Sequence, residues 1–465
     1  MSRDLRGWIE EVELKAPGEL LRVKRSVAPD RFEPTALLEQ LEDRGEYPAV
    51  LFERITNLKG EPTPFMALMN VFGNPRKIGL AMGLAEPAGR AELFQTYLRR
   101  AAQPRKVQVV APGEAPAKEV VVRGRDLDLA ALPFFRHNYM EGGPYFTGIV
   151  GARALDSQRY NISWNRMMYL DATHMATYMS PRHLWSHFYE AEEQGQALPG
   201  ALVLGHHPGF HLASAALTTL NDDEYEVAGG VLGEPLRVTP SEAYGEALLV
   251  PADAEVLIEG EIVPHRRTIE GPYGEFTGYT GPERLSWLFE VKALSMRRDA
   301  IFIEIFGSHR DNMAAHFPIE AHIYDRVRHA VPTVKDLCWI ESGGPHNLII
   351  SIKKRIEGEP LRAAMAAIAA SNFIKHVIVV DEDIDPGDLR EVSWALATRF
   401  QAEDDLTVLK GMQGHVLDPS LRHEIRGSGM VLDCTVPLDR PYPRRARVPK
   451  DVRERMPLGE YLPDR

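Results

Sequence analysis

The sequence predicts an α+β protein in which a β-rich middle region is followed by a compact α/β unit. Between about residues 105 and 305, most segments are strand-like and are separated by turn residues. Few helices interrupt this region, which is typical of a barrel or sandwich rather than of a doubly wound sheet. After about residue 320, strand and helix patterns alternate at short intervals, as in an α/β unit.

The N-terminal part, residues 1–104, mixes both patterns. Helical spacing extends over residues 3–14 and again over residues 34–45, where a glycine provides a helix stop. The apolar segments at residues 20–25 and 48–55 predict strands. We therefore expect an N-terminal α/β segment.

The middle region, residues 105–315, carries most of the predicted strands. They cover residues 106–112, 118–124, 146–155, 161–170, 200–205, 255–264, 288–297 and 300–307. Helical patterns interrupt them at residues 182–195 and 221–233. A helix over residues 316–330 is predicted to link this region to the next.

The α/β unit is predicted over residues 331–436. Its strands and helices alternate over residues 348–354, 359–371, 375–385 and 388–400. Residues 437–465 are rich in Pro and Arg. We expect them to form a C-terminal arm that lies on a neighbouring subunit.

Composition indicates a globular protein and argues against several classes of partner. Of the 465 residues, 44% are hydrophobic and 26% charged, and the net charge is -12. Scattered Lys and Arg on an acidic chain argue against nucleic acid as the main partner. An apolar signal core and a membrane-length apolar run of roughly 20 residues are both missing, so we expect a cytoplasmic protein without a membrane partner. The distant Cys338 and Cys434 predict neither a disulfide framework nor a thiolate zinc site.

The stretch EGPYGEFTGYTG, residues 270–281, places two carboxylates on either side of a Gly-Pro-Tyr-Gly insert. In a continuous strand, Glu270 and Glu275 would face opposite sides, and in a helix they would lie about 140° apart. The glycines and the proline permit a tight turn, which would let both carboxylates enter one cavity. Close like charges raise the pKa of one carboxyl group and make it a proton donor. An ordinary hairpin turn with solvated glutamates is the alternative interpretation.

Polar side chains follow one face of the predicted strand NISWNRMMYL. Alternation puts Asn161, Ser163 and Asn165 on one face, and Trp164 and Arg166 on the other. An arginine in a barrel wall suits a phosphate or carboxylate, which its planar fork grips in two places. A surface salt bridge explains Arg166 equally well.

Histidines and acidic residues add candidate ligands. His183 follows Ser-Pro-Arg at a helix start, where free backbone N–H groups also point toward an anion, and Glu224 lies in an acidic helix start. An Asn, a His and a Glu together suit a hard or borderline divalent ion such as Mg²⁺ or Mn²⁺. Structural or solvated roles are the alternative for each residue. The acidic run at residues 381–385 is interpreted as a solvated strand end.

In combination, these segments resemble the motifs of the UbiD family of reversible decarboxylases, which use prenylated flavin mononucleotide (prFMN). EGPYGEFTGY resembles the glutamate-bearing loop of the family, and NISWNRM resembles the strand with its Asn and catalytic Arg. SPRH and DEYEVAG resemble its metal-binding His and Glu segments. Their order and spacing also fit, and the resemblance covers nearly the whole chain. Walker A, GxSxG, HExxH and Rossmann motifs are absent from the sequence.

The resemblance implies a role for each matching residue. Asn161, His183 and Glu224 would bind Mn²⁺ or Mg²⁺, often with K⁺ beside it, and the divalent ion would bridge to the flavin phosphate. Arg166 with Glu270 and Glu275 would form the catalytic Glu–Arg–Glu network. The wider cofactor-binding set would be Thr147, Asn161, Ser163, Trp164, Asn165, Arg166, Arg182, His183 and Glu224.

The resemblance also implies a fold and a reaction. A split β-barrel flavin-binding domain would be joined by a helix to an α/β oligomerisation domain, in a homodimer or homohexamer, and a prenyl-flavin synthase would supply the cofactor. The reaction would be reversible, non-oxidative decarboxylation of an aromatic, heteroaromatic or α,β-unsaturated carboxylic acid. A decarboxylase of an aromatic acyl-CoA, of the phthaloyl type, is one alternative, and a non-catalytic flavin- or metal-binding assembly protein is another.

Two segments depart from the family pattern. Many members carry a lysine near the cofactor phosphate in a segment like GGKMGLDAT, whereas this chain has GSGMVLDCT with Gly429 at that position. Arg426 is a candidate replacement for the lysine. The segment FGSHRDNMAAHF offers His309, Arg310 and His316, which predicts a polar or additionally anionic substrate.

Overall fold

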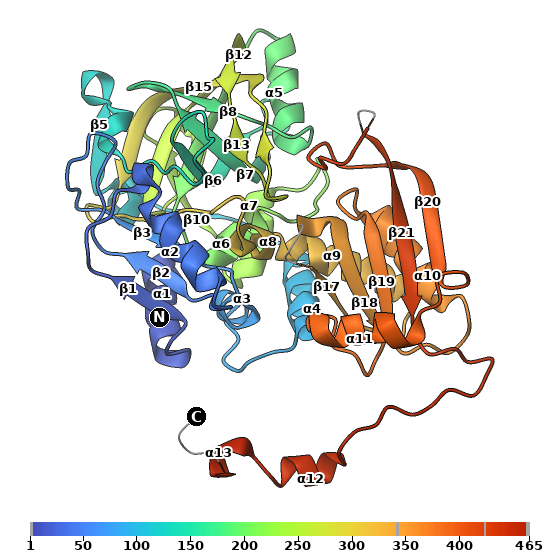
Figure 1. Cartoon of the computed structure of the whole chain (residues 1–465). Coiled ribbons are helices and arrows are strands. Elements are labelled where there is room, and N and C mark those ends of the chain that lie inside the picture. Colours follow the sequence, from blue (N-terminus) through green and yellow to red (C-terminus); the bar gives the residue numbers. More distant parts are fainter. Residues whose placement is uncertain (1–2, 341–343, 423–424, 462–465) are drawn as a thin grey trace.

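Six antiparallel strands of the middle region close into a barrel, which lies at the upper left of Figure 1. The structure, a computed structural model, describes residues 3–340, 344–422 and 425–461. The barrel order is β12-β9-β6-β7-β8-β15, and pairing of β12 with β15 closes it. The strands are β6 (Tyr145–Arg153), β7 (Tyr160–Tyr169), β8 (His174–Thr177), β9 (Leu198–Leu204), β12 (Val256–Glu270) and β15 (Arg284–Met296). The predicted α+β class and β-barrel are confirmed.

Both faces of the barrel wall are covered by apolar residues. In register, Val150 of β6 pairs with Leu202 of β9 and lies in one apolar core, whereas the neighbouring pair Ile149 and Val203 lies in another. Because side chains alternate along a strand, this pattern buries the wall from both sides. The surrounding elements of this region are β5 (Val120–Arg123), α5 (His183–Glu193), α6 (Pro208–Ala213), α7 (Glu224–Leu232), β13 (Tyr273–Gly274), β14 (Thr280–Gly281) and α8 (Arg310–Ala315).

Two smaller sheets flank the barrel. A three-stranded sheet is formed by β4 (Gln108–Val109), β10 (Arg237–Ser241) and β11 (Gly245–Pro251). The N-terminal sheet has the order β1-β2-β3-β16, with β1 (Leu20–Val23), β2 (Ala49–Phe52), β3 (Met66–Met69) and β16 (Ile301–Ile303). The strand predicted at residues 300–307 therefore leaves the barrel and pairs in parallel with β3.

The N-terminal helices are α1 (Leu5–Lys15), α2 (Glu33–Glu42), α3 (Pro75–Ala81) and α4 (Arg90–Ala101). The first two lie where helices were predicted, and Gly45 follows α2 with a φ of 71°. Helices α3 and α4 and strand β3 were not predicted. None of the described helices combines the length and the apolar character needed to cross a membrane.

The C-terminal domain is a five-stranded sheet with the order β17-β18-β19-β21-β20. Its strands are β17 (Val334–Trp339), β18 (Asn347–Ile352), β19 (His376–Asp381), β20 (Leu406–Gln413) and β21 (Arg426–Cys434), and its helices are α10 (Glu359–Ala370) and α11 (Leu389–Arg399). Helix α9 (Phe317–Ala330) lies where the linking helix was predicted. It packs on α4, where the rings of Phe317 and Phe94 stack with centroids 5.1 Å apart.

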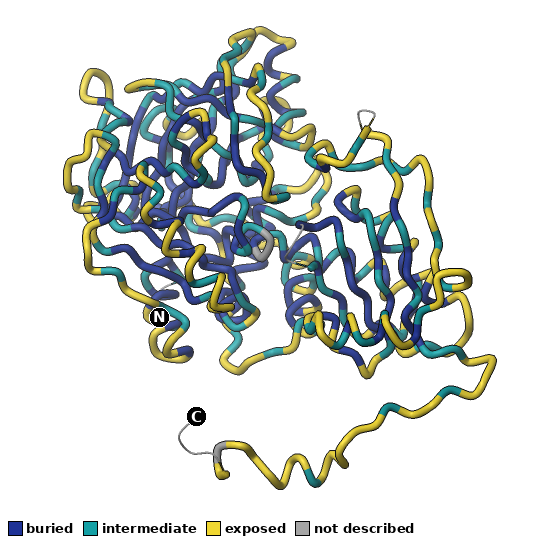
Figure 2. Tube along the Cα trace, in the orientation of Figure 1, coloured by how far each residue is buried: buried dark blue, intermediate teal, exposed yellow. Residues whose placement is uncertain are grey.

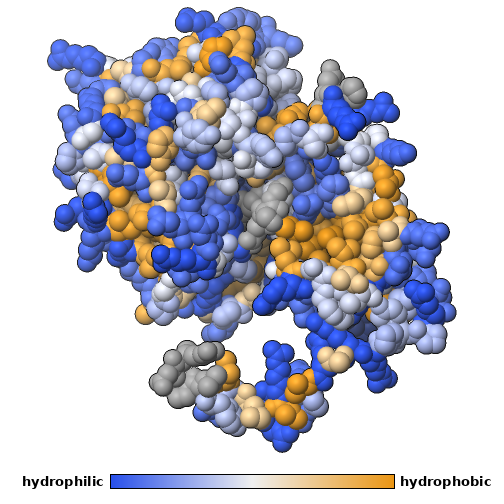
Figure 3. Space-filling view, viewed as in Figure 1, coloured by the Kyte–Doolittle hydropathy of each residue, from blue (hydrophilic) through white to orange (hydrophobic). Residues whose placement is uncertain are grey.

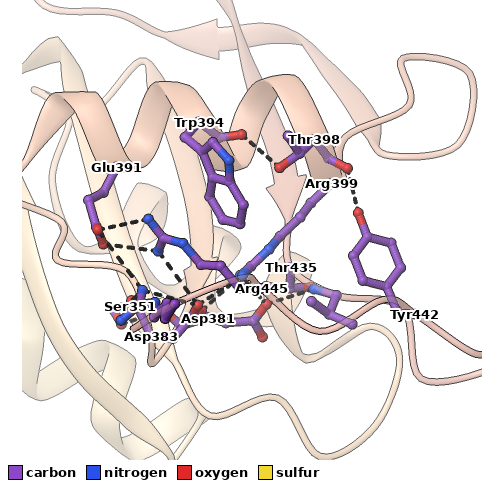
Figure 4. Close-up of polar contacts among 12 residues, drawn as sticks. Ser351, Asp381, Asp383, Glu391, Trp394, Thr398, Arg399, Thr435, Tyr442 and Arg445 are labelled. Carbon is purple, nitrogen blue, oxygen red and sulfur yellow. Dashed lines mark hydrogen bonds and ion pairs between the residues drawn. The ribbon is translucent and has the colours of Figure 1, made fainter. Parts of the chain in front are cut away.

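The acidic run at residues 381–385 lies at the end of β19, with Glu382, Asp383 and Asp385 exposed, so its interpretation as a solvated strand end holds. Asp381 and Asp383 are in addition ion-paired (Figure 4). Arg399 of α11 donates to Asp381 at 2.8 Å and to Asp383 at 2.9 Å. From the C-terminal segment, Arg445 bonds to Glu391 at 2.9 Å and lies 4.0 Å above the ring of Trp394. These contacts anchor the base of the C-terminal arm.

Beyond this anchor, the arm extends away from the body of the protein and is largely exposed (Figure 2). It ends in two short helices, α12 (Lys450–Glu454) and α13 (Leu458–Tyr461). Met456, Leu458 and Tyr461 are 53%, 67% and 57% exposed. The arm thus presents apolar side chains that its own chain does not cover.

Candidate active site

Arg166, on β7, bridges the two glutamates of the loop. Its Nε and Nη2 donate to Glu270 at 2.7 and 3.1 Å, and its Nη1 donates to Glu275 Oε1 at 2.6 Å. The three side chains are at most 9% exposed. Burial alone would lower the pKa of Arg166, but the two carboxylates outweigh burial and raise it. The carboxylates therefore meet at one guanidinium, as the tight turn predicted, and they are not solvated.

The Gly-Pro-Tyr-Gly insert makes this meeting possible. β12 ends at Glu270, and the chain reverses through the short β13–β14 pair, in which Tyr273 faces Gly281. Gly271 has a φ of 94°, and a Cβ there would lie 2.9 Å from the carbonyl oxygen of Pro282. The hairpin interpretation is therefore correct for the backbone, while the packing around it buries both glutamates.

Three tyrosines, which sequence reasoning missed, surround the charged cluster. Tyr145 of β6 donates its hydroxyl to Glu270 Oε1 at 3.2 Å. Burial, and then the charge of Glu270, raise the pKa of Tyr145, so its hydroxyl stays a donor. The Arg166 guanidinium lies 4.5 Å from the ring centroid of Tyr273 and 5.1 Å from that of Tyr178. Of the three, only Tyr273 could have been found from the local sequence, because it lies between the two glutamates.

A second polar cluster forms around Glu224, the first residue of α7. Its Oε2 accepts from Asn161 Nδ2 at 2.8 Å and from the N–H of Ile162 at 2.7 Å. Its Oε1 lies 3.0 Å from His183 Nδ1 and accepts from Thr218 at 2.6 Å. The carboxylate is buried, so its interpretation as a solvated helix face is wrong.

This cluster suits a divalent ion. It offers a carboxylate, an imidazole and a side-chain amide, and the oxygen and nitrogen donors match the preferences of Mn²⁺ and Mg²⁺. The part of the chain that the structure describes contains no metal-like group of three or more His, Cys, Asp or Glu residues. Holding an ion here would therefore require the amide oxygen of Asn161 as the third donor.

The remaining predicted cofactor residues lie around these two clusters. Thr147 pairs in register with Arg166, and its Oγ1 lies 3.2 Å from the Tyr273 hydroxyl. Asn165 donates to the hydroxyl of Ser163 at 2.9 Å, on the face that also carries Asn161. Trp164, on the opposite face, packs on His211 with ring centroids 5.1 Å apart. The indole is only partly buried and packs against the apolar core on one side.

Arg182 precedes α5 and is exposed. None of the described residues forms a hydrogen bond or ion pair with its guanidinium. An arginine without a protein anion, next to His183, is suited to an anionic ligand.

The two departures from the family pattern have structural explanations. Gly429 lies in β21, and a Cβ there would lie 2.0 Å from the carbonyl oxygen of Lys375, so this strand has no room for a lysine. Arg426 is exposed at the start of the same strand.

Of the three predicted basic residues, neither histidine meets the expectation: burial lowers the pKa of His316, and it has the same effect on His309. His309 is buried with its Nε2 3.1 Å from Glu42, and burial lowers its pKa to about 4. The prediction of a basic side chain at these two positions is therefore wrong. Arg310 stacks on Tyr47 at 4.0 Å and lines a cavity of about 80 Å³, and His316 bonds through Nδ1 to the carbonyl oxygen of Asn312.

Comparison with known proteins agrees with this geometry. Residues 12–96, 108–309 and 312–434 match the N-terminal, Rift-related and C-terminal domains of 3-octaprenyl-4-hydroxybenzoate carboxy-lyase. An anhydromevalonate phosphate decarboxylase from Methanothermobacter thermautotrophicus is 34% identical over 67% of this chain and 74% of its own. This chain belongs to the UbiD family. The family predicted from the motifs is thereby confirmed.

Other UbiD-family members match over nearly the full length. A phenolic acid decarboxylase from Sedimentibacter hydroxybenzoicus is 29% identical over 96% of this chain and 94% of its own. The UbiD-class enzyme HmfF from Pelotomaculum thermopropionicum, solved in complex with FMN, superposes with a TM-score of 0.90 at 35% identity, over 99% of this chain and 100% of its own. An evolved dimeric form of HmfF, solved with prFMN, gives a TM-score of 0.87 at 34% identity, over the same shares of the two chains.

Proposed function

We propose that this UbiD-family protein is a prFMN-dependent carboxy-lyase that reversibly decarboxylates an aromatic, heteroaromatic or α,β-unsaturated carboxylic acid. The observation that carries the proposal is the buried Glu270–Arg166–Glu275 cluster. A cofactor-binding protein without catalysis has no need of two carboxylates on one arginine. Relatives named phenolic acid decarboxylase and gallate decarboxylase support an aromatic acid as substrate.

The cofactor residues follow from the second cluster. Asn161, His183 and Glu224 would hold Mn²⁺ or Mg²⁺, with K⁺ beside it, at the flavin phosphate. Thr147, Ser163, Trp164 and Asn165 would line the flavin. Arg182 would give the phosphate a cation in place of the lysine that Gly429 excludes, with Arg426 as the alternative. FMN and prFMN in the HmfF structures support this assignment.

When bound, prFMN supplies an electron sink for the carbon that loses carbon dioxide. Arg166 orients the substrate carboxylate through its planar fork. Both oxygens of Glu270 bond to Arg166, whereas Glu275 bonds only through Oε1. Glu275 is also the more exposed, at 8% against 0%. We therefore assign proton delivery to Glu275 Oε2 and the holding of Arg166 to Glu270.

The proposal is tested by loading the protein with cofactor and offering a panel of acids. Co-expression with a prenyl-flavin synthase should yield holoenzyme that catalyses exchange of labelled bicarbonate into at least one aromatic or heteroaromatic acid. Holoenzyme that retains prFMN and metal but exchanges label into no member of the panel would contradict the assignment.

The cavity beside Arg310 favours one second candidate, decarboxylation of an aromatic acyl-CoA. Arg90 and Arg310 both line it, together with Glu320, and Arg90 also pairs with Asp336 at 2.8 Å. Guanidinium groups suit the phosphates of a CoA ester. Thermal stabilisation of the holoenzyme by such an ester, but not by the free acid, would favour this candidate.

We also propose that the protein works as a homodimer or homohexamer whose C-terminal arm lies on a second copy of the chain. Two observations support this: the arm carries exposed apolar residues beyond its Arg445 anchor, and exposed apolar side chains are also present on the C-terminal domain (Figure 3). On that domain they include Ile356, Leu361, Met365, Leu406 and Val408. A second copy would cover the arm.

A further inference from the structure

A second buried charge cluster lies behind the turn that carries Glu275. His137 Nε2 is 3.1 Å from Glu304 Oε1, and its Nδ1 is 3.6 Å from Glu141 Oε1. All three side chains are 0% exposed. Burial alone would lower the pKa of His137, but the two carboxylates raise it to about 10, so the ring is an imidazolium. The mechanism above uses none of these residues, although buried charges are costly unless they are paired.

Contacts connect this cluster to Arg166. The N–H of Thr147 donates to the two oxygens of Glu304 at 2.9 and 3.1 Å. The Thr147 hydroxyl lies 3.2 Å from the Tyr273 hydroxyl, and the ring of Tyr273 lies under the Arg166 guanidinium at 4.5 Å. Glu304 therefore reaches Arg166 through two intermediate residues.

The segments that carry the cluster also press directly against the turn. Glu141 accepts from Asn138, and a Cβ on Gly274 would lie 2.0 Å from Nδ2 of Asn138. Gly307, three residues after Glu304, is also packed tightly, because a Cβ there would lie 2.8 Å from the Tyr273 hydroxyl. Neither glycine leaves room for the turn to move toward the cluster.

The ring of His137 packs between the segment that carries Phe135 and the segment that carries Phe306. It stacks between Phe135, 6.1 Å away at 11°, and Phe306, 6.0 Å away at 19°. Its edge meets the ring of Tyr273 at 6.2 Å. The imidazolium therefore contacts both supporting segments and the turn itself.

We propose that His137 and Glu304 are positioning residues for the decarboxylase site: they hold Tyr273 against Arg166 and thereby fix the turn that presents Glu275. The catalytic part of this inference rests on the proposed function. The mechanical part does not, because it concerns the order of residues 271–281 in the protein without cofactor.

The mechanical part is tested by hydrogen–deuterium exchange in the unloaded protein. Glu304→Gln and His137→Gln should speed exchange in peptides covering residues 271–281. Glu255→Gln is the matched control, because it removes another carboxylate that is 0% exposed and ion-paired, with Arg6 as its partner. Exchange in the turn that is unchanged in both variants, or equally raised in the control, would overturn the proposal.

The catalytic part is tested in the holoenzyme with a responsive acid. For Glu304→Gln we expect kcat, normalised to bound flavin, to fall about 10- to 100-fold with little change in KM, since small displacements at a reacting centre cost rates of this order. Tyr273→Phe, which removes only the hydroxyl contact, should give a smaller fall in the same direction. Tyr273→Phe also provides the test of the catalytic part if Glu304→Gln fails to fold.

The double variant separates positioning from general destabilisation. If Glu304 acts through Tyr273, the Glu304→Gln, Tyr273→Phe double variant should lose no more activity than Glu304→Gln alone. Losses that multiply would overturn the proposal. A wild-type holoenzyme inert toward every acid would refute the proposed function, whereas the exchange measurement would still decide the positioning role.

Discussion

At the scale of single residues, the two glutamates on Arg166 differ in their hydrogen bonding. Glu270 uses both oxygens on the guanidinium and accepts a further bond from Tyr145. In Glu275, Oε2 has no hydrogen-bond partner among the described residues. Both oxygens of Glu270 are therefore used to hold Arg166, whereas Oε2 of Glu275 remains available to carry a proton.

The metal assignment predicts the effect of removing one ligand. His183→Ala should lower the metal content of the purified holoenzyme and, with it, the flavin content, because the ion would bridge protein and phosphate. His174→Ala is the control, since His174 pairs with Asp171 at a more exposed position. Metal is measured by plasma mass spectrometry and flavin by absorbance. Equal metal content in the two variants would contradict the assignment.

The imidazolium of His137 predicts a pH-dependent contribution to stability. Its pKa is raised from about 6.5 to about 10 in the fold by Glu141 and Glu304, against the effect of burial. The stability that it contributes is therefore fully present below about pH 6.5 and is lost as the pH rises through about 10. In denaturant unfolding, the free-energy difference between wild type and His137→Gln should shrink from pH 6.5 to pH 10. A difference that is constant or grows would contradict the charged state.

At the scale of elements, local signals predicted the two clusters but not their support. Strand alternation in β7 placed Asn161 and Arg166 on opposite faces, and the Gly-Pro-Tyr-Gly insert predicted the turn. His137 and Glu304 are 167 positions apart, and neither lies in a recognisable pattern. Their meeting depends on tertiary packing, which a local pattern does not encode.

The same limit explains the elements that were missed or misplaced. β16 continues the strand pattern of the barrel region, yet it pairs in parallel with β3 of the N-terminal sheet. The burial of Glu224 and the ion pairs of Asp381 were likewise invisible, because their partners come from distant segments. The residues of each cluster were therefore predictable from local sequence patterns, whereas their burial and their distant partners were not.

The turn itself predicts a contrast between two glycines. Gly271 and Gly278 both have positive φ, 94° and 76°, but only Gly271 lies against other atoms. Gly271→Ala should displace the turn and lower kcat about 10- to 100-fold by moving Glu275. Gly278→Ala carries a similar backbone cost without the clash, and its kcat should change much less. Equal kcat values in the two variants would contradict the role of the turn.

At the scale of the whole molecule, a closed barrel with its two flanking sheets is joined to a five-stranded C-terminal sheet, from which an arm extends that is anchored at its base by Arg445. The barrel carries both polar clusters, and α9 leads from it to the C-terminal sheet. From the exposed arm we predict that the protein assembles with a second copy of the chain.

Charges placed on the arm should weaken assembly. Met456→Asp with Leu458→Asp should shift the mass measured by light scattering toward the monomer, because the apolar contacts with a second copy would be lost. Arg453→Asp, on the same arm, is a control for added negative charge. An unchanged mass in the double variant would contradict the proposed place of the arm.

The most direct test of the central claim is label exchange in Glu275→Gln holoenzyme. Glutamine keeps the shape of the side chain and a bond to Arg166 but cannot deliver a proton. With flavin and metal content equal to wild type, we predict that exchange of labelled bicarbonate into the responsive acid falls by at least about 100-fold. Exchange at the wild-type rate would contradict the assignment of Glu275 as the proton donor and, with it, the proposed mechanism.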